Sequence, residues 1–219
     1  MKVITALHTP QPGAALLDPA FRADVAAAGA TRLQVNLDDD AVAPAMRFGP
    51  GAPITAVVSA WDADAAALLD VVRRLDPDTD AWRVDEREPL VPPAVPDGER
   101  SDALANWAFL RRPVAMEHDA WLQDWLERHT PVAIDTQGTF GYAQHPVVEH
   151  LTPGGRDVAG IVEELFPMAA MSDHHAFYGS GGDEEEFQRR FTTLMESCAL
   201  FGATDGLDLV PTSRYRFEL

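Results

Sequence analysis

The chain has 219 residues, 46% of them hydrophobic, which is enough for the core of one large globular domain or of two small ones. Its 35 acidic and 17 basic residues give a formal net charge of −18 at pH 7. This charge would repel phosphate backbones and anionic lipid surfaces, so it argues against nucleic acid and membranes as partners.

Cysteine usage and the N-terminal sequence indicate where the protein works. Cys198 is the single cysteine, so no internal disulfide can form. Residues 1–5 are not followed by the long apolar stretch and cleavage site of a signal peptide. No other stretch approaches the roughly 20 apolar residues that cross a membrane. We therefore expect a reduced, cytoplasmic protein.

Hydrophobic periodicity divides the first half of the chain into six segments. Leu33, Val35 and Leu37 alternate with polar residues, which is typical of a strand with one buried face. Gly29 is placed to end the helix before it. In chain order the pattern predicts strand, helix, strand, strand, helix and strand at residues 3–7, 16–28, 33–37, 54–61, 63–75 and 81–88. This is the order of a ferredoxin-like unit.

Prolines mark the middle of the chain. Four of them, beginning with Pro89, precede an Asp-Gly pair, and we expect no ladder or helix there but a stiff linker at residues 91–102. The linker separates a first unit, residues 1–90, from a second, residues 103–219. The second unit repeats the order, with strands and helices expected at residues 104–110, 118–129, 139–150, 158–166, 183–201 and 207–217.

Two such units suggest how the chain packs. Each ferredoxin-like unit leaves one sheet face bare, and two bare faces can bury each other. We therefore predict an α+β fold of two tandem ferredoxin-like (βαββαβ) units, with antiparallel sheets packed face to face as a pseudo-dimeric α/β barrel. The outer strands of each sheet could still pair with a second copy, so a homodimer is left open.

One segment of the second unit combines residue type and spacing in a way that points to chemistry. Trp121, Trp125 and His129 are four residues apart, so they form one stripe on a helix that must be buried. Pro131 limits His129 to the end of that helix. We expect His129 to lie where the helix meets its sheet.

This segment resembles the EthD family of the dimeric α/β-barrel superfamily. In that family a strand ending in Arg is followed by a helix with an aromatic residue, Trp and His at four-residue spacing, and then by Pro. The segment from Trp121 to Pro131 fits this frame without a gap, and Tyr142 and Gln144 fit the Tyr-x-Gln of the following strand. The resemblance implies a pocket in the gap between the two sheets.

The resemblance also selects the candidate site residues. His129 is a candidate general acid or base, because a His titrates near neutrality, and Tyr142 could polarise a carbonyl. The alternatives are purely structural: His129 could bond the last carbonyls of its own helix, and Tyr142 could be a packing residue of the core. Tyr142 and Gln144 share one face of their strand, while His145 points to the other. The substrate-binding candidates are Arg111, Trp107, Trp125, Gln144 and His145.

Metals and cofactors find little support in the sequence. Asp173, His174 and His175 resemble part of a metal site, but adjacent histidines diverge on regular elements and no third ligand is fixed by spacing. Cys198 lies in the apolar stripe of the last helix, as a core thiol would. A Gly-rich phosphate loop is not found. We expect no metal and no cofactor.

Three classes of function remain open, each with a small apolar or aromatic molecule as the partner. The resemblance favours a cofactor-independent acid/base enzyme, with a lyase or cyclase ranked before a dehydratase or an oxygenase, acting on an aromatic or polyketide-like compound. The second class is an accessory or small-molecule-binding protein without turnover. The third is a haem-binding barrel, in which a pocket His is an axial ligand.

The first unit is expected to be a lid. Phe21, Val25 and Gly29 keep the four-residue spacing of the His129 stripe, but none of them can transfer a proton. We therefore predict one site per chain, with Phe48 or Trp61 as contacts from the first unit to a flat ligand.

Overall fold

The first unit of the computed structural model has the expected order of elements. The structure describes residues 1–204 and 206–219. A short 3-10 turn, η1 (Asp40–Val42), follows the second strand. The helices and strands of this unit are β1 (Lys2–Leu7), α1 (Gly13–Leu16), α2 (Pro19–Ala27), β2 (Arg32–Leu37), β3 (Ala56–Trp61), α3 (Ala65–Arg73) and β4 (Asp80–Val84).

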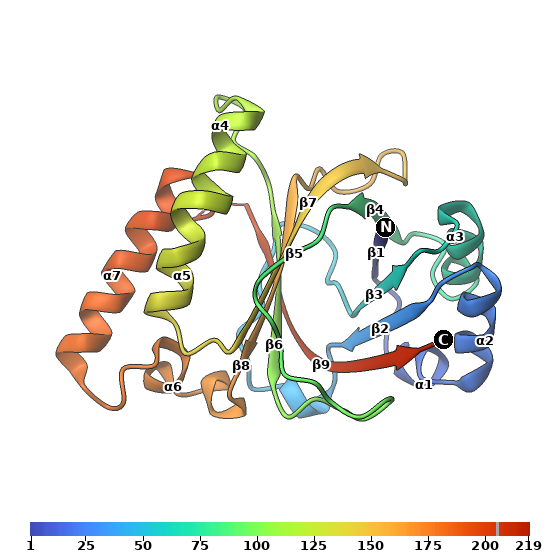
Figure 1. Ribbon diagram of the computed structural model, residues 1–219, viewed down its shortest axis with the longest axis horizontal. Helices are drawn as coiled ribbons and strands as arrows, with labels where there is room; N and C mark the ends of the chain where they lie inside the picture. The colour runs from blue at the N-terminus through green and yellow to red at the C-terminus, as the bar shows by residue number, and fades with distance from the viewer. Residues whose placement is uncertain (205) are drawn as a thin grey trace.

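The second unit repeats this order with additional short helices. Its elements are β6 (Leu104–Leu110), α4 (His118–Gln123), the π-helix η2 (Asp124–His129), α5 (Thr130–Thr136), β7 (Gly141–His150), β8 (Gly160–Phe166), the 3-10 turn η3 (Met168–Met171), α6 (His174–Tyr178), α7 (Glu184–Leu200) and β9 (Asp208–Glu218). Figure 1 shows α4, α5 and α7 on one side of the strands and α2 and α3 on the other.

The two sheets close into one antiparallel barrel within the chain. The strand order β4-β1-β3-β2-β9-β6-β8-β7 is completed by pairing between β4 and β7. The joints are β2 with β9, where Leu33 lies opposite Phe217, and β4 with β7, where Trp82 lies opposite His150. The predicted pseudo-dimeric α/β barrel is therefore confirmed. The outer strands that we left open for a second copy pair with each other at these joints.

Side chains fill the space between the two sheets. Trp82 from the first unit and Trp107 and Phe109 from the second are buried there in one core. Lys2 and Glu163 are buried at the same inner face, among further polar residues. The resemblance implied a pocket in this gap. Aromatic side chains fill its middle, and a cavity lined by Ile54 and Val210 of the same core lies at one end of the barrel.

An additional strand, β5 (Arg87–Leu90), lies at the edge of the second sheet and pairs with β7. It contains Pro89, which we expected to exclude ladder pairing. Proline removes one backbone donor, and an edge strand can lose a donor on its unpaired side. The irregular connection to β6 therefore begins after Leu90.

The His129 helix is longer than predicted. It does not end before Pro131 but runs through α4, η2 and α5 to Thr136. In an α-helix Pro131 would remove one backbone bond and its ring would meet a carbonyl of the preceding turn. The π-helical turn widens the backbone there, and the Thr130 hydroxyl donates to the Trp125 carbonyl at 3.1 Å. His129 consequently lies within a continuous helix, not at its end.

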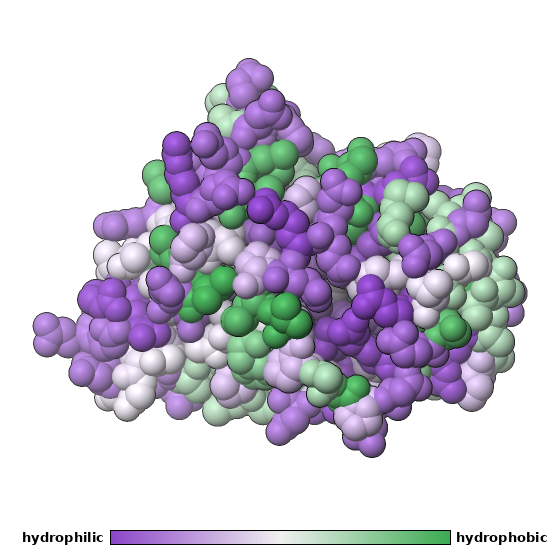
Figure 2. Space-filling model, in the orientation of Figure 1, coloured by the Kyte–Doolittle hydropathy of each residue, from purple (hydrophilic) through white to green (hydrophobic). Residues whose placement is uncertain are grey.

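The outer surface agrees with the acidic composition. The face in Figure 2 is largely hydrophilic, with hydrophobic residues gathered in small areas near its middle. Among the described residues, no helix combines the length and apolar character needed to cross a bilayer.

Candidate active site

A mainly apolar cavity lies between the outer face of the second sheet and the helices that cover it. Its volume is about 230 Å³. The walls come from β6, β7 and β8 below, from η2 at one side and from α7 and the residues after it above. We call it the helix-side cavity. Its polar and titratable lining residues are His129, Gln137, Tyr142, Glu164, Tyr178, Cys198 and Thr204.

His129 faces this cavity from the π-helical turn. Only 7% of its surface is exposed, and its Nδ1 lies 3.0 Å from Ser197 Oγ on α7. The ring packs on Phe201, with 4.7 Å between the centroids. Burial lowers the pKa of His129 to about 4. The imidazole is therefore neutral at pH 7, and donation from Nδ1 to Ser197 would leave Nε2 as a base. Its contact is Ser197, not the carbonyls of its own helix.

Tyr142 and Glu164 are cross-strand partners on the floor of the cavity. Burial raises the pKa of the Glu164 carboxyl to about 7. Gln137 donates to Glu164 Oε1 at 2.9 Å in the amide orientation that satisfies both groups. Burial first, and then the neighbouring Glu164, raise the pKa of Tyr142 well above its usual value. Near neutral pH the floor therefore presents a Tyr hydroxyl and a carboxyl that is partly protonated.

Two more candidates lie on the same side of the sheet. Trp125 lines the cavity and packs on Trp121, with ring centroids 5.1 Å apart. Gly160 lies beneath them, where a Cβ would overlap the Trp125 indole. Gln144 is fully buried and donates to Thr130 Oγ1 at 2.6 Å, which ties β7 to the π-helical turn. Gln144 thus positions the His129 helix and does not itself line the cavity.

Trp107 and His145 lie on the opposite, barrel-facing side of the sheet. Their rings stack at 5.8 Å with an interplanar angle of 9°. His145 Nε2 is 2.8 Å from Lys2 Nζ, and its Nδ1 is 3.2 Å from the Ile161 carbonyl oxygen. Burial lowers the pKa of His145 to about 4. The sheet separates both residues from His129, so the structure does not bring them into the helix-side cavity.

Arg111 is paired within the protein. Its guanidinium donates to Asp208 at 2.7 Å and also to the Gly206 carbonyl. Asp208 in turn accepts from Arg156 at 2.7 Å. The guanidinium that we considered for substrate binding is therefore engaged in an ion pair at the barrel end.

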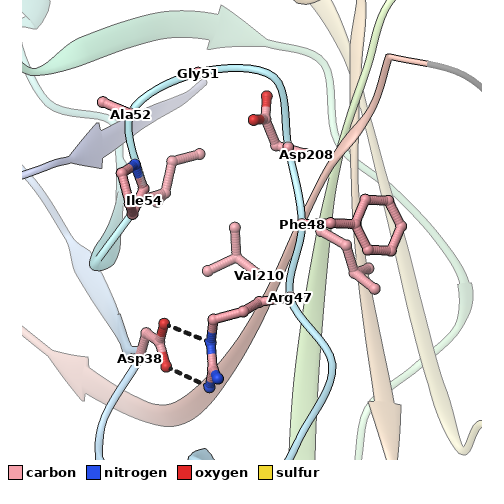
Figure 3. Close-up of a pocket in the computed structure, with 11 residues that line it drawn as sticks. Asp38, Arg47, Phe48, Gly51, Ala52, Ile54, Asp208 and Val210 are labelled. Carbon is pink, nitrogen blue, oxygen red and sulfur yellow. Dashed lines mark hydrogen bonds and ion pairs between the residues drawn. The ribbon is translucent and has the colours of Figure 1, made fainter.

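A second cavity, of about 210 Å³, lies beside this ion network (Figure 3). Asp38 accepts two hydrogen bonds from Arg47 at one side of it, at 2.9 and 3.0 Å, and Asp208 lies at the other side. Gly49 passes so close to Asp208 that a Cβ would overlap the carboxylate. The polar groups named here are committed to ion pairs, which makes this cavity a weaker candidate for chemistry.

The first unit contributes less to the helix-side cavity than expected. Phe48 lines it, as predicted for one wall. Trp61 lies elsewhere, with its Nε1 donating to Glu86 at 2.7 Å and Lys2 Nζ 4.3 Å from its ring centroid.

Sequence reasoning missed Glu164 and Gln137 as lining residues of this cavity and Ser197 as the hydrogen-bond partner of His129. Glu163 and Glu164 are adjacent in the sequence, and strand alternation sends one into the barrel and the other into the cavity. The register of β8 against β7 decides which of the two glutamates faces the barrel interior and which faces the cavity. Ser197 lies one residue before Cys198 on the stripe of α7 that was read as purely apolar.

One group of side chains lies close enough together to hold a metal ion. The ligand atoms of His174, His175 and Glu184 lie within 4.8 Å of one another, and the His rings are 4.3 Å apart. The expectation that adjacent histidines diverge is therefore wrong here, because α6 begins at His174 and places both rings against the start of α7. His174 and Glu184 are exposed, and such groups are common on surfaces without a metal.

Comparison with known proteins gives the fold a context. No family model matches the sequence, and no curated protein matches it significantly. An anthrone oxidase-like protein has a similar structure, with 10% identity, a TM-score of 0.60, and coverage of 99% of this chain and 92% of the other. A candidate monooxygenase from Lactobacillus acidophilus has 9% identity, a TM-score of 0.50, and coverage of 99% and 95%. These likenesses show the fold alone.

Proposed function

We propose that this protein is a cofactor-independent enzyme that performs acid/base chemistry on a small apolar aromatic or polyketide-like compound bound in the helix-side cavity. The observation that carries the proposal is the convergence of His129, Tyr142 and Glu164 on one apolar cavity. Burial shifts their pKa values so that a neutral imidazole faces two groups that can hold a proton near pH 7. Pairs of titratable groups with pKa values shifted in this way mark acid and base roles.

The chemistry follows from these protonation states. His129 Nε2 takes a proton from an acidic C–H or phenolic O–H of the substrate. The Tyr142 hydroxyl and the protonated Glu164 carboxyl donate hydrogen bonds to the oxyanion that develops. In an apolar cavity such donors act more strongly than in water. General acid/base groups of this kind contribute about 10² to 10⁴ in rate.

The reaction class that we rank first is an oxygenase. The names of the two similar structures, anthrone oxidase-like and monooxygenase, support this ranking over the lyase or cyclase favoured by the resemblance to EthD proteins. In the oxygenase reaction, dioxygen is the oxidant. The deprotonated substrate carbon bonds to dioxygen, and the outer oxygen atom of the resulting peroxide takes a proton. Loss of the second hydrogen and cleavage of the oxygen–oxygen bond then leave a carbonyl and one water.

Cavity size limits the substrate. At about 230 Å³ the helix-side cavity exceeds the roughly 150 Å³ that holds a benzene ring and falls below the ~300–1,000 Å³ of drug-sized pockets. A mono- or bicyclic compound suits it. A haem would be harder to place there, so haem binding is the least favoured of the three classes.

The test is oxygen uptake by the purified protein with 2-tetralone, a bicyclic ketone with an acidic CH2 group, as the first substrate, alongside lyase and cyclase assays on hydroxylated naphthalenes. We expect turnover that His129→Gln lowers by at least about 100-fold. Saturable binding without turnover in any of these assays would favour the accessory class. An absorbance spectrum with a haem band would favour the third.

A further inference from the structure

A third cavity, of about 260 Å³, adjoins the helix-side cavity. The two share Phe177, Tyr178 and Leu209 as lining residues, so these side chains form the partition between them. The floor of both is the outer face of one strand, β6. Leu104 and Asn106 line the third cavity, and Ala108 and Leu110 line the helix-side cavity. The two cavities are thus neighbouring chambers on one sheet face. The helix-side cavity is called the first chamber, and the third cavity is called the second chamber.

Asn106 is the polar group of this second chamber that lacks a partner. Only 5% of its surface is exposed, and its Oδ1 has no hydrogen-bond partner among the described residues. Its cross-strand neighbour on β9 is Pro211, which has no polar side chain. A buried polar atom without a partner costs stability, so a structure that retains one calls for an explanation.

Asn106 also belongs to a row of polar residues across the sheet. It lies directly opposite Glu164 on β8, and Glu164 lies directly opposite Tyr142 on β7. Neighbouring strands are about 4.8 Å apart, so the row spans roughly 10 Å. Its two ends lie in different chambers, with Tyr142 in the first and Asn106 in the second.

We propose that the second chamber is part of the ligand site and that Asn106 accepts a hydrogen bond from a hydroxyl at the far end of a hydroxylated aromatic ligand. The ligand's near end then lies against Tyr142 and Glu164. This inference rests on the proposed function, because it takes the helix-side cavity as the substrate site. It extends the substrate class from a single apolar ring system to a longer one with a polar group at each end.

The test compares the binding of two probes, 2-naphthol and 2,6-dihydroxynaphthalene, by isothermal titration calorimetry. Wild-type protein should bind the diol about 3- to 10-fold more tightly, the effect of one additional neutral hydrogen bond. Asn106→Leu should remove this preference and leave the affinity for 2-naphthol within about 2-fold. Met171→Leu, an apolar change in the same chamber, should retain the preference.

A stability measurement separates recognition from a structural role. Asn106→Leu replaces an amide whose buried oxygen has no partner by an apolar side chain of similar size, so the melting temperature should stay constant or rise. Asn36 is the matched control, a fully buried Asn whose amide donates to Thr212 Oγ1 at 2.9 Å and accepts from Gln34 at 2.8 Å. Asn36→Leu should lower the melting temperature.

Three results would overturn the inference. An unchanged diol preference in Asn106→Leu would show that Asn106 does not recognise the ligand. A clear loss of melting temperature in Asn106→Leu would assign it a structural role. Failure of wild-type protein to bind either probe would exclude the chamber as a site for hydroxylated aromatics. Because the readout is binding, a preference that Asn106→Leu abolishes would stand even if no turnover were found, and the proposed function would then fail alone.

Discussion

Tyr142 on β7 lies directly opposite Glu164 on β8, and both side chains line the cavity beneath α7. Cross-strand partners on one face have Cβ atoms about 5 Å apart, so each residue shapes the environment of the other. The Glu164 charge adds to burial in raising the pKa of Tyr142. This pair, facing His129 across the cavity, is the basis of the predictions on activity.

The first prediction concerns His129. His129→Gln keeps a polar side chain but removes the base, so kcat/KM should fall about 10²- to 10⁴-fold. The melting temperature should stay near the wild-type value, because the wild-type ring is held by one hydrogen bond and apolar contacts that Gln can partly replace. Steady-state kinetics and thermal melts measure the two effects. The matched control is His118→Gln, since His118 is an exposed His on the same helix. Equal losses of activity in both variants would refute the role of His129.

The second prediction is the pH dependence of activity. His129 must be unprotonated to act as a base, and burial lowers its pKa to about 4, so kcat/KM should rise as pH increases through about 4. Glu164 must be protonated to donate, and burial raises its pKa to about 7, so kcat/KM should fall above about 7. The profile of kcat/KM against pH should therefore be a bell. A profile that rises through pH 6 to 7 and stays high would contradict both assignments.

Glu164→Gln tests the alkaline limb alone. A Gln side chain still donates a hydrogen bond but does not ionise. The fall of kcat/KM above about pH 7 should disappear in this variant, while the acidic limb near pH 4 remains. If the alkaline limb persists unchanged, another group titrates there and Glu164 is not the donor.

The fourth prediction concerns the polar core of the barrel. Glu163 lies 3.1 Å from Arg214 Nε, and both side chains are almost fully buried. Burial alone would raise the pKa of Glu163, but the charges of Arg214 and Lys2 hold it below its usual value. Glu163→Gln leaves Arg214 buried without a countercharge and should lower the free energy of unfolding by about 3–5 kcal/mol.

Urea denaturation measures this loss, with Glu149→Gln as the control. Glu149 pairs with Arg83 at 2.6 Å on the exposed surface, where removal of one partner should cost about 1 kcal/mol or less. Activity per folded molecule should survive Glu163→Gln, because the barrel interior and the cavity lie on opposite faces of β8. Similar losses of unfolding free energy in the two variants would show that the buried pair contributes no more to stability than the surface pair.

The fifth prediction tests His8 at the barrel end. Its hydrogen bond to Asp80, 3.2 Å from His8 Nε2, raises the pKa of the ring. A raised His pKa adds stability that is complete below the unfolded value of about 6.5 and is lost as pH rises through the folded value. His8→Gln should therefore reduce unfolding free energy below about pH 6.5, by roughly 1 kcal/mol or less for this partly exposed pair, and have little effect at pH 9. Probe binding should be unchanged, and a pH-independent loss would contradict the ion pair.

Much of the fold could be predicted because local patterns determine it. Alternation in segments such as Leu33, Val35 and Leu37 identified strands, and two bare sheet faces had only each other to cover them. The π-helical turn could not be predicted, because Pro131 usually ends a helix and the compensating contact, Thr130 to Trp125, depends on the geometry of the turn itself.

The candidate site was predicted in part, because its residues are distant in sequence. The resemblance pointed to His129 and Tyr142, and both line one cavity. Trp107 was grouped with them, yet it lies behind the sheet, because strand alternation sets which residues share a face but not which face the helices cover. Glu164 shares the cavity with His129 only through the register of β8, and Ser197 meets His129 only through the packing of α7.

The most direct test is a crystal structure of the protein with bound 2-naphthol. The ligand should lie between β8 and α7, with its ring against Phe201 and its hydroxyl near His129 Nε2, Tyr142 or Glu164. Electron density for the ligand inside the barrel, beside Trp107 and His145, would contradict the assignment of the site to the helix side of the sheet.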